Sequence, residues 1–261
     1  MNKAMSAIIK KDLHSITANR RFFISLLIVP LLFTLLLPSV FVLTAYFVPE
    51  DPDVQAMLEL LPQETWAGDP GFALLHLIFN YILPVFFLII PIMASSIMAA
   101  SSFVGEKEKH TLETLFYAPL SLDQIFRSKV LASFLLSMAV SLLSFLGMFI
   151  VVEAEIFFLM GTFLVPGPNW LIILALLSPS VSLIAVTLIV KGSAKAQSME
   201  ESQQSAVFLI LPLLLLIVGQ VSGLMLLSPW ILLILSLICI GIACILLKRA
   251  VKGFAYERLL E

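Results

Sequence analysis

The sequence predicts an all-α polytopic membrane protein with six transmembrane helices and both termini in the cytoplasm. Of its 261 residues, 61% are hydrophobic and only 12% are charged, whereas a soluble domain is about half apolar and about a quarter charged. The apolar residues gather in six segments that are almost free of charge, and all fifteen basic residues fall on one side of the arrangement these imply. So much apolar surface must face lipid, which argues against a soluble enzyme, a disulfide scaffold, a disordered chain and a nucleic-acid binder.

Six segments are long enough to cross a membrane. A bilayer core of about 30 Å needs roughly 20 apolar residues in a helix, and the only charged residue in these segments is Lys248, the last residue of the sixth. The predicted spans are residues 22–48, 73–103, 130–152, 169–190, 206–226 and 228–248. We expect a single transmembrane domain over residues 1–261. The first span should remain as an anchor, because charged residues precede it and no small-residue cleavage site follows it.

The basic residues predict the orientation. They precede span one, lie between spans two and three and between spans four and five, and follow span six. The opposite loops, residues 49–72, 153–168 and 227–229, hold eight acidic residues and no Lys or Arg. The net charge is therefore +6 on one side and −8 on the other. By the positive-inside rule, both termini lie in the cytoplasm and the protein sits in the cytoplasmic membrane.

The N-terminal stretch, residues 1–21, predicts an amphipathic helix. Its apolar residues recur at helical spacing, and its lysines fall mainly on the other side. We expect it to lie on the inner leaflet with its lysines near lipid phosphates, and a plain surface anchor is the alternative. The apolar residues are Met5, Ile8, Ile9, Leu13 and Ile16.

Three features within or beside the spans have open interpretations. The first, second, fourth and fifth spans contain proline, which membrane helices commonly tolerate and which could also shape a hinge or a cavity. Gly219 and Gly223 form a GxxxG motif, which could mark an interface with a second subunit or packing within the chain. Residues 156–165 are apolar but short, so we expect an outer interfacial or re-entrant segment. A looser continuation of span three is the rival.

The cytoplasmic stretch 104–129 carries the most information. Glu106 and Glu108 are typical of a helix N-terminus, where the helix dipole favours acids. Pro119 should end that helix, and Ser121 with Gln124 forms a capping box that starts the next one. Two helices in about 25 residues favour docking of a soluble partner over a solvated loop. The first helix would present a small apolar face made of Leu112, Leu115 and Phe116.

The stretch before span five contains a second capping box. Ser198 and Glu201 have the required spacing. Span five should therefore begin as a helix on the cytoplasmic side.

The 104–129 stretch resembles the type-2 permeases of ATP-binding-cassette (ABC) transporters. The resemblance rests on the run Glu106-Lys107-Glu108, then Thr111-Leu112-Glu113-Thr114-Leu115, Pro119 and Lys129. It implies that this loop is the coupling helix that touches an ATPase subunit. The residues it assigns to that contact are Glu106, Lys107, Glu108, Thr111, Leu112, Glu113 and Leu115.

Three departures from the family pattern stand out. Many members have a glycine just before the threonine, where this chain has Lys109-His110. The loop after span one has 24 residues, whereas many members carry a large outer domain there. Two spans fill residues 206–248, which leaves no room for the family's re-entrant element between spans five and six.

No catalytic or cofactor motif is evident. The chain lacks G-x-x-x-x-G-K-[ST], so we expect it not to be an enzyme, and ATP and Mg would be bound by a partner ATPase. It also lacks H-E-x-x-H, and its three histidines are far apart, so we expect no metal site.

The sequence therefore predicts the transmembrane permease subunit of an ATP-driven exporter. Its partners would be two copies of an ABC ATPase, a second permease chain in a homodimer or a related heterodimer, and membrane lipid. Spans that are almost free of charge favour a lipid, an amphipathic peptide or a drug-like molecule as cargo. A secondary carrier or channel is the first alternative, although such carriers usually keep ionisable residues near the midplane. A non-transporting assembly or immunity protein is the second.

Overall fold

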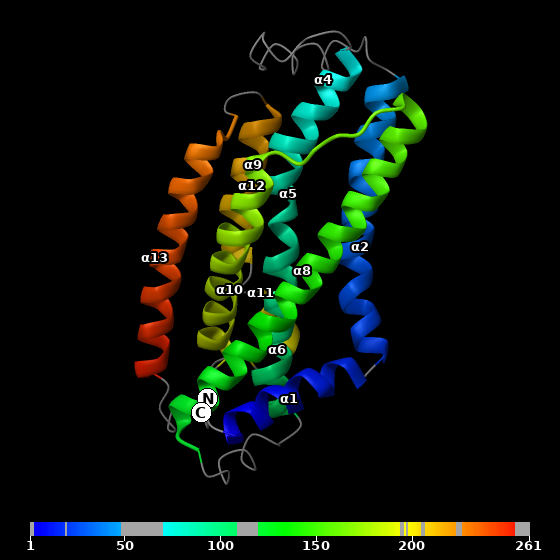
Figure 1. Cartoon of the computed structure of the whole chain (residues 1–261). Helices are drawn as coiled ribbons and strands as arrows, with labels where there is room; N and C mark the ends of the chain where they lie inside the picture. Colours follow the sequence, from blue (N-terminus) through cyan, green and yellow to red (C-terminus); the bar gives the residue numbers. More distant parts are fainter. Residues whose placement is uncertain are drawn as a thin grey trace.

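The computed structural model describes residues 3–18, 20–47, 70–108, 120–193, 196, 198–204, 207–222 and 226–253. Every regular element within these residues is a helix. Long helical segments run side by side along a bundle, and a shorter helix lies across one end (Figure 1). The elements are α1 (Lys3–Ala18), α2 (Arg20–Phe47), α4 (Pro70–Leu77), η2 (Ile78–Ile82), α5 (Leu83–Phe87), α6 (Ile89–Glu108), α8 (Leu122–Met160), α9 (Pro168–Ile172), η3 (Ile173–Leu177), α10 (Ser178–Ser193), α11 (Met199–Gln204), α12 (Val207–Val221) and α13 (Pro229–Gly253).

The long segments confirm a multi-pass membrane protein. Within the described residues, five helices are long and apolar enough to cross a membrane, and the apolar stretch Pro30–Thr44 within α2 is shorter. These helices overlap the predicted spans two to six, while α2 overlaps the first. The five are Gly71–Glu108, Leu122–Met160, Pro168–Ser193, Glu201–Val221 and Pro229–Ala250.

The amphipathic helix predicted at the N-terminus is α1. It lies across the same end of the bundle at which α6 and α13 end (Figure 1). Ile8 and Ile9 are buried, and Lys3, Lys10 and His14 are exposed. The apolar face of α1 therefore packs on the protein itself, and Lys3, Lys10 and His14 point away from the bundle.

The helices α6, α8 and α10 form the centre of the bundle. Small and hydroxyl-bearing side chains line their contacts, which lets the backbones approach closely. The Ser137 hydroxyl of α8 lies 2.7 Å from the Ser182 hydroxyl of α10, and both are buried. Large apolar side chains instead face outward on α2, α12 and α13, as lipid contact requires. Examples are Leu36, Phe208 and Trp230, which are 60%, 78% and 75% exposed.

The outer apolar segment follows the rival interpretation. Residues 156–160 continue α8, which ends at Met160. Gly161 adopts a left-handed conformation with φ 68°, and its amide donates to the Phe157 carbonyl. The chain then runs without regular structure to Gly167, and the Leu164 amide donates to the Glu153 carboxylate at 3.2 Å. Residues 156–160 therefore continue the third predicted span, as the alternative interpretation expected, and a left-handed glycine ends the helix after them.

Two π-helical segments, η2 and η3, explain how the bundle accommodates two of its prolines. Each ends two residues before a proline, Pro84 or Pro179. In an α-helix the proline ring would clash with the carbonyl four residues back and leave it without a donor. The wider π turn moves the register by one residue, so that the Leu83 amide bonds to Ile78 and the Ser178 amide to Ile173.

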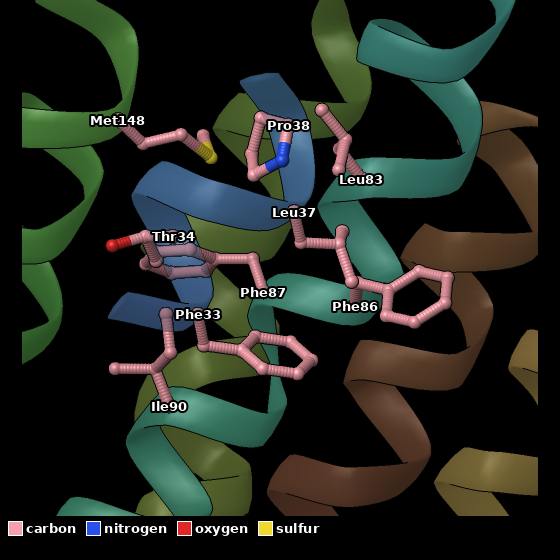
Figure 2. Close-up of a pocket in the computed structure, with 9 residues that line it drawn as sticks. All are labelled: Phe33, Thr34, Leu37, Pro38, Leu83, Phe86, Phe87, Ile90 and Met148. Atoms are coloured by element: carbon pink, nitrogen blue, oxygen red, sulfur yellow. The ribbon is translucent and has the colours of Figure 1, made fainter. Parts of the chain in front are cut away.

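A small apolar pocket lies where α2 meets α5, α6 and α8 (Figure 2). Thr34 is among its lining residues, but its hydroxyl donates to the Pro30 carbonyl of its own helix at 2.9 Å and points away from the pocket (Figure 2). The pocket therefore suits apolar groups. Its lining residues are Phe33, Thr34, Leu37, Pro38, Leu83, Phe86, Phe87, Ile90 and Met148.

Candidate functional site

The candidate site is a group of charged side chains at the end of the bundle where α6 stops and α8 starts. Its centre is Lys129, which is only 1% exposed although it carries a charge. The local sequence fixes its position, because Ser121 caps α8 two turns earlier. The Ser121 hydroxyl accepts from the Gln124 amide at 3.3 Å, and the Gln124 side chain accepts from the Ser121 amide at 3.2 Å. The predicted capping box is thus confirmed.

Lys129 is held by groups from two other helices. Its ammonium lies 2.8 Å from Glu106 Oε2 and 3.6 Å from Asp12 Oδ2. It also donates to the Ser102 carbonyl at 2.6 Å. The Phe103 ring, with its centroid 5.3 Å away, covers another side of the ammonium. A buried cation needs such partners, because leaving one unpaired costs several kcal/mol.

The group closes into a network that joins α1, α6 and α8. The Ser102 hydroxyl donates to Asp12 at 2.9 Å. On the outer side of the group, Lys11 donates to Glu106 Oε1 at 2.8 Å. The charges of two carboxylates and two ammonium groups therefore cancel. Two consecutive residues of α1, Lys11 and Asp12, contact α6 and α8.

The pKa of Lys11 reflects this arrangement. Partial burial by itself lowers that pKa, but the hydrogen bond and charge of Glu106, together with the charge of Asp12, outweigh burial and raise it above its usual value. Lys11 therefore stays charged at physiological pH and holds the outer carboxylate oxygen of Glu106.

A second contact links the end of α6 to the start of α11. Glu108 accepts from the Met199 amide at 2.9 Å. Next to it, the Ser198 hydroxyl accepts from the Glu201 amide at 3.1 Å, which confirms the predicted cap at the start of this helical segment. Gly105 faces the Met199 side chain so closely that an added Cβ would lie 3.3 Å from its sulfur. The last turn of α6 therefore touches the segment leading into α12.

The structure corrects the role expected of Glu106 and Glu108 in starting a helix. Both lie in the last turn of α6, where the helix dipole disfavours acids. Glu106 is compensated there by two lysines, and Glu108 by the free amide at the start of α11. Partners on other helices therefore compensate both acids at a position where the helix dipole disfavours them.

The predicted site residues divide into two sets. Glu106, Lys107 and Glu108 lie together at the end of α6. Gly219 lies near the end of α12, and its partner in the GxxxG motif, Gly223, is outside the described residues. The other predicted contact residues also lie outside the described part of the chain, and they are Thr111, Leu112, Glu113 and Leu115.

The sequence interpretation missed Asp12, Lys11 and Ser102. A signal for Asp12 was present, because it follows Ile8 by four residues and Ile9 by three. It therefore lies on the apolar face of α1, where an acid predicts a buried partner. Ser102 carries no comparable signal, because small polar residues are common in packed membrane helices.

The arrangement is suited to mechanical connection rather than to a reaction. Among the residues that the structure describes, no group of three or more His, Cys, Asp or Glu side chains could hold a metal ion. What the site offers is a junction of α1, α6, α8 and α11 to which the stretch 104–129 contributes Glu106, Glu108 and Lys129.

Comparison with known proteins agrees with this geometry. A family model described as ABC-2 type transporter matches residues 3–219. The match begins at the first residue of α1 and ends near the C-terminal end of α12, so it includes every member of the charged network. No curated protein matches the chain.

Proposed function

Because the chain belongs to the ABC-2 type transporter family, we propose that it is the transmembrane permease subunit of an ATP-driven exporter. Two permease chains form the pathway, as a homodimer or a heterodimer, and two ATPase subunits bind on the cytoplasmic side. The family match carries this proposal, and the charged network beside the 104–129 loop supports it. If the chain has six spans and both termini are cytoplasmic, the loop between spans two and three is cytoplasmic too, and the network lies on the side where the ATPase binds.

The network gives the loop a way to act on the bundle. Closure of the ATPase dimer on ATP would push on the coupling loop, and the push would enter α6 at Glu106 and Glu108. A displacement of α6 would also displace α1 and α8, which are bonded to it through the charged network. The Glu108–Met199 contact would displace α11 and, with it, α12. Coupled movement of whole helices is a rigid-body form of switching.

The cargo is apolar or amphipathic. Apart from Lys248 at the end of the sixth, the predicted spans carry no charged residue. A small, strongly charged solute would lack partners along such a path. Lipids, amphipathic peptides and drug-like molecules fit these requirements.

The coupling role is tested with the double variant Leu112→Ala/Glu113→Ala. We expect it to lose association with the ATPase and to lose ATP-dependent transport, measured after co-purification from native membranes and in vesicles. The matched control is Phe163→Ala/Val165→Ala, which removes two exposed apolar side chains near the opposite end of the bundle. The control should retain both properties.

Two results would contradict the proposal. One is survival of ATPase assembly and transport in the Leu112/Glu113 variant. The other is transport that continues after ATP depletion and follows an imposed ion gradient, which would favour a secondary carrier. Mass spectrometry of the co-purified proteins and lipids would identify the second permease and report on the cargo.

A further inference from the structure

The second span is interrupted near the end of the bundle opposite the charged network, at η2 (Figure 1). Pro84 has no amide hydrogen, and the Leu83 amide bonds to Ile78 instead of Phe79. The carbonyls of Phe79 and Asn80 therefore lose the backbone donors that an unbroken helix would supply. Buried carbonyls without donors are costly in a membrane, so other groups must satisfy them.

Three side chains from other segments supply these donors. Trp170 Nε1 donates to the Phe79 carbonyl at 2.9 Å, and Asn169 Nδ2 donates to the Asn80 carbonyl at 2.9 Å. Gln220 Nε2 donates to the Tyr81 carbonyl at 3.2 Å. All three donors are at least 98% buried. Three consecutive carbonyls of η2, those of Phe79, Asn80 and Tyr81, thus accept hydrogen bonds from side chains of α9 and α12.

The other π segment differs in the source of the side-chain donor to its last carbonyls. Within η3, the carbonyls of Leu176 and Leu177 accept from the Ser180 hydroxyl at 2.5 and 3.0 Å. That donor belongs to the helix that directly continues η3, so the helix carries it along in any movement. The η2 donors are different, because they stay in place only while α9 and α12 remain against the second span.

The buried amides also have unused hydrogen-bonding atoms. Among the residues that the structure describes, Asn80 Nδ2, Asn169 Oδ1 and Gln220 Oε1 are buried without a hydrogen-bond partner. Each amide side chain therefore uses one end and keeps a complementary donor or acceptor for another arrangement. Such a set can exchange partners when the helices shift, instead of leaving every group unsatisfied.

We propose that η2 is a hinge in the second span, latched by Trp170, Asn169 and Gln220, and that separation of α9 and α12 from this span releases it. The structure holds the latched form. Release frees the outer part of the second span, α4, to move relative to α6. The timing of release in a transport cycle rests on the proposed function, whereas the latch itself does not.

The latch is tested by hydrogen–deuterium exchange of the peptide covering Ile78–Phe87, in the full-length protein in nanodiscs. Trp170→Phe and Gln220→Met remove the donors and keep most of the side-chain volume. We expect exchange to rise roughly fivefold for each donor removed and about 25-fold in the double variant, because a hydrogen bond contributes on the order of 1 kcal/mol. The control is Ser180→Ala, which should leave exchange in η2 unchanged.

A second arm uses the complex of the wild-type chain with its ATPase. Exchange in η2 should rise when ATP is trapped on the complex and fall again without nucleotide. Unchanged exchange in the double variant would overturn the latch, and if that variant does not fold, Gln220→Met alone decides. If exchange in η2 rises in the variants but is the same in the ATPase complex with and without trapped ATP, release during transport is overturned. If no ATPase binds the chain, the proposed function fails, and the variant arm still decides the latch.

Discussion

At the residue scale, Lys129 shows how a charge is kept at the edge of an apolar bundle. Its ammonium meets two carboxylates and a backbone carbonyl, and the four charges of the network cancel. Such an arrangement adds little stability compared with an apolar core, but loss of one member leaves the others buried and unpaired. The network therefore acts mainly to fix one arrangement of α1, α6 and α8.

Replacement of the central lysine should be costly. We expect Lys129→Met to destabilise the protein by about 3 kcal/mol, because Glu106 and Asp12 remain near their places without the central cation. Arg127→Met is the matched control, since Arg127 pairs with Asp123 on the exposed side of the same helix at 3.0 Å and should cost under about 1 kcal/mol. The measurement is unfolding by SDS titration in mixed micelles, and equal losses in both variants would refute the role of the network.

At the element scale, periodicity and capping residues predicted much of what the structure contains. The long apolar runs predicted the long helices, and Ser121 with Gln124 predicted the start of α8. The helical spacing of apolar residues such as Ile8 and Ile9 predicted α1. Contacts between distant segments were beyond sequence reasoning. The place of Asp12 under Lys129 and the donors from α9 and α12 to η2 depend on how helices pack in three dimensions.

The junction of α9 with η2 leaves no room for a side chain at Gly167. Its amide donates to Asn80 Oδ1 at 2.5 Å, and an added Cβ would lie 3.0 Å from that oxygen. We expect Gly167→Ala to displace Asn80 and to lower stability by about 1–3 kcal/mol. Gly241→Ala is the control, because nothing lies within 4 Å of its added Cβ and alanine favours a helix by up to ~1 kcal/mol. Thermal unfolding of both variants decides, and an unchanged midpoint for Gly167→Ala would contradict the close approach.

At the scale of the whole molecule, charge sorting predicts orientation. The predicted loops of one side sum to +6 and those of the other to −8. In the structure α1, the end of α6 and the end of α13 share one end of the bundle, as an even number of crossings requires (Figure 1).

Labelling in intact cells tests this orientation. In a chain whose Cys239 and Cys244 are replaced by serine, Phe163→Cys should react with a membrane-impermeant maleimide. Asp123→Cys should react only after the membrane is opened. Phe163 is exposed and the Asp123 side chain is 42% exposed, so the reagent can reach both positions. The reverse pattern would invert the topology, and with it the assignment of the charged network to the cytoplasm.

The length of α8 has a consequence for how far a small displacement can reach. Its 39 residues extend about 58 Å, nearly twice the hydrocarbon thickness of a bilayer. Lys129 lies near one end, and Glu153, which holds the chain beyond α8 through the Leu164 amide, lies near the other. A tilt of about 5° around the midpoint of such a rod moves each tip by roughly 2.5 Å, in opposite directions. The helix can thus work as a lever with its fulcrum in the membrane.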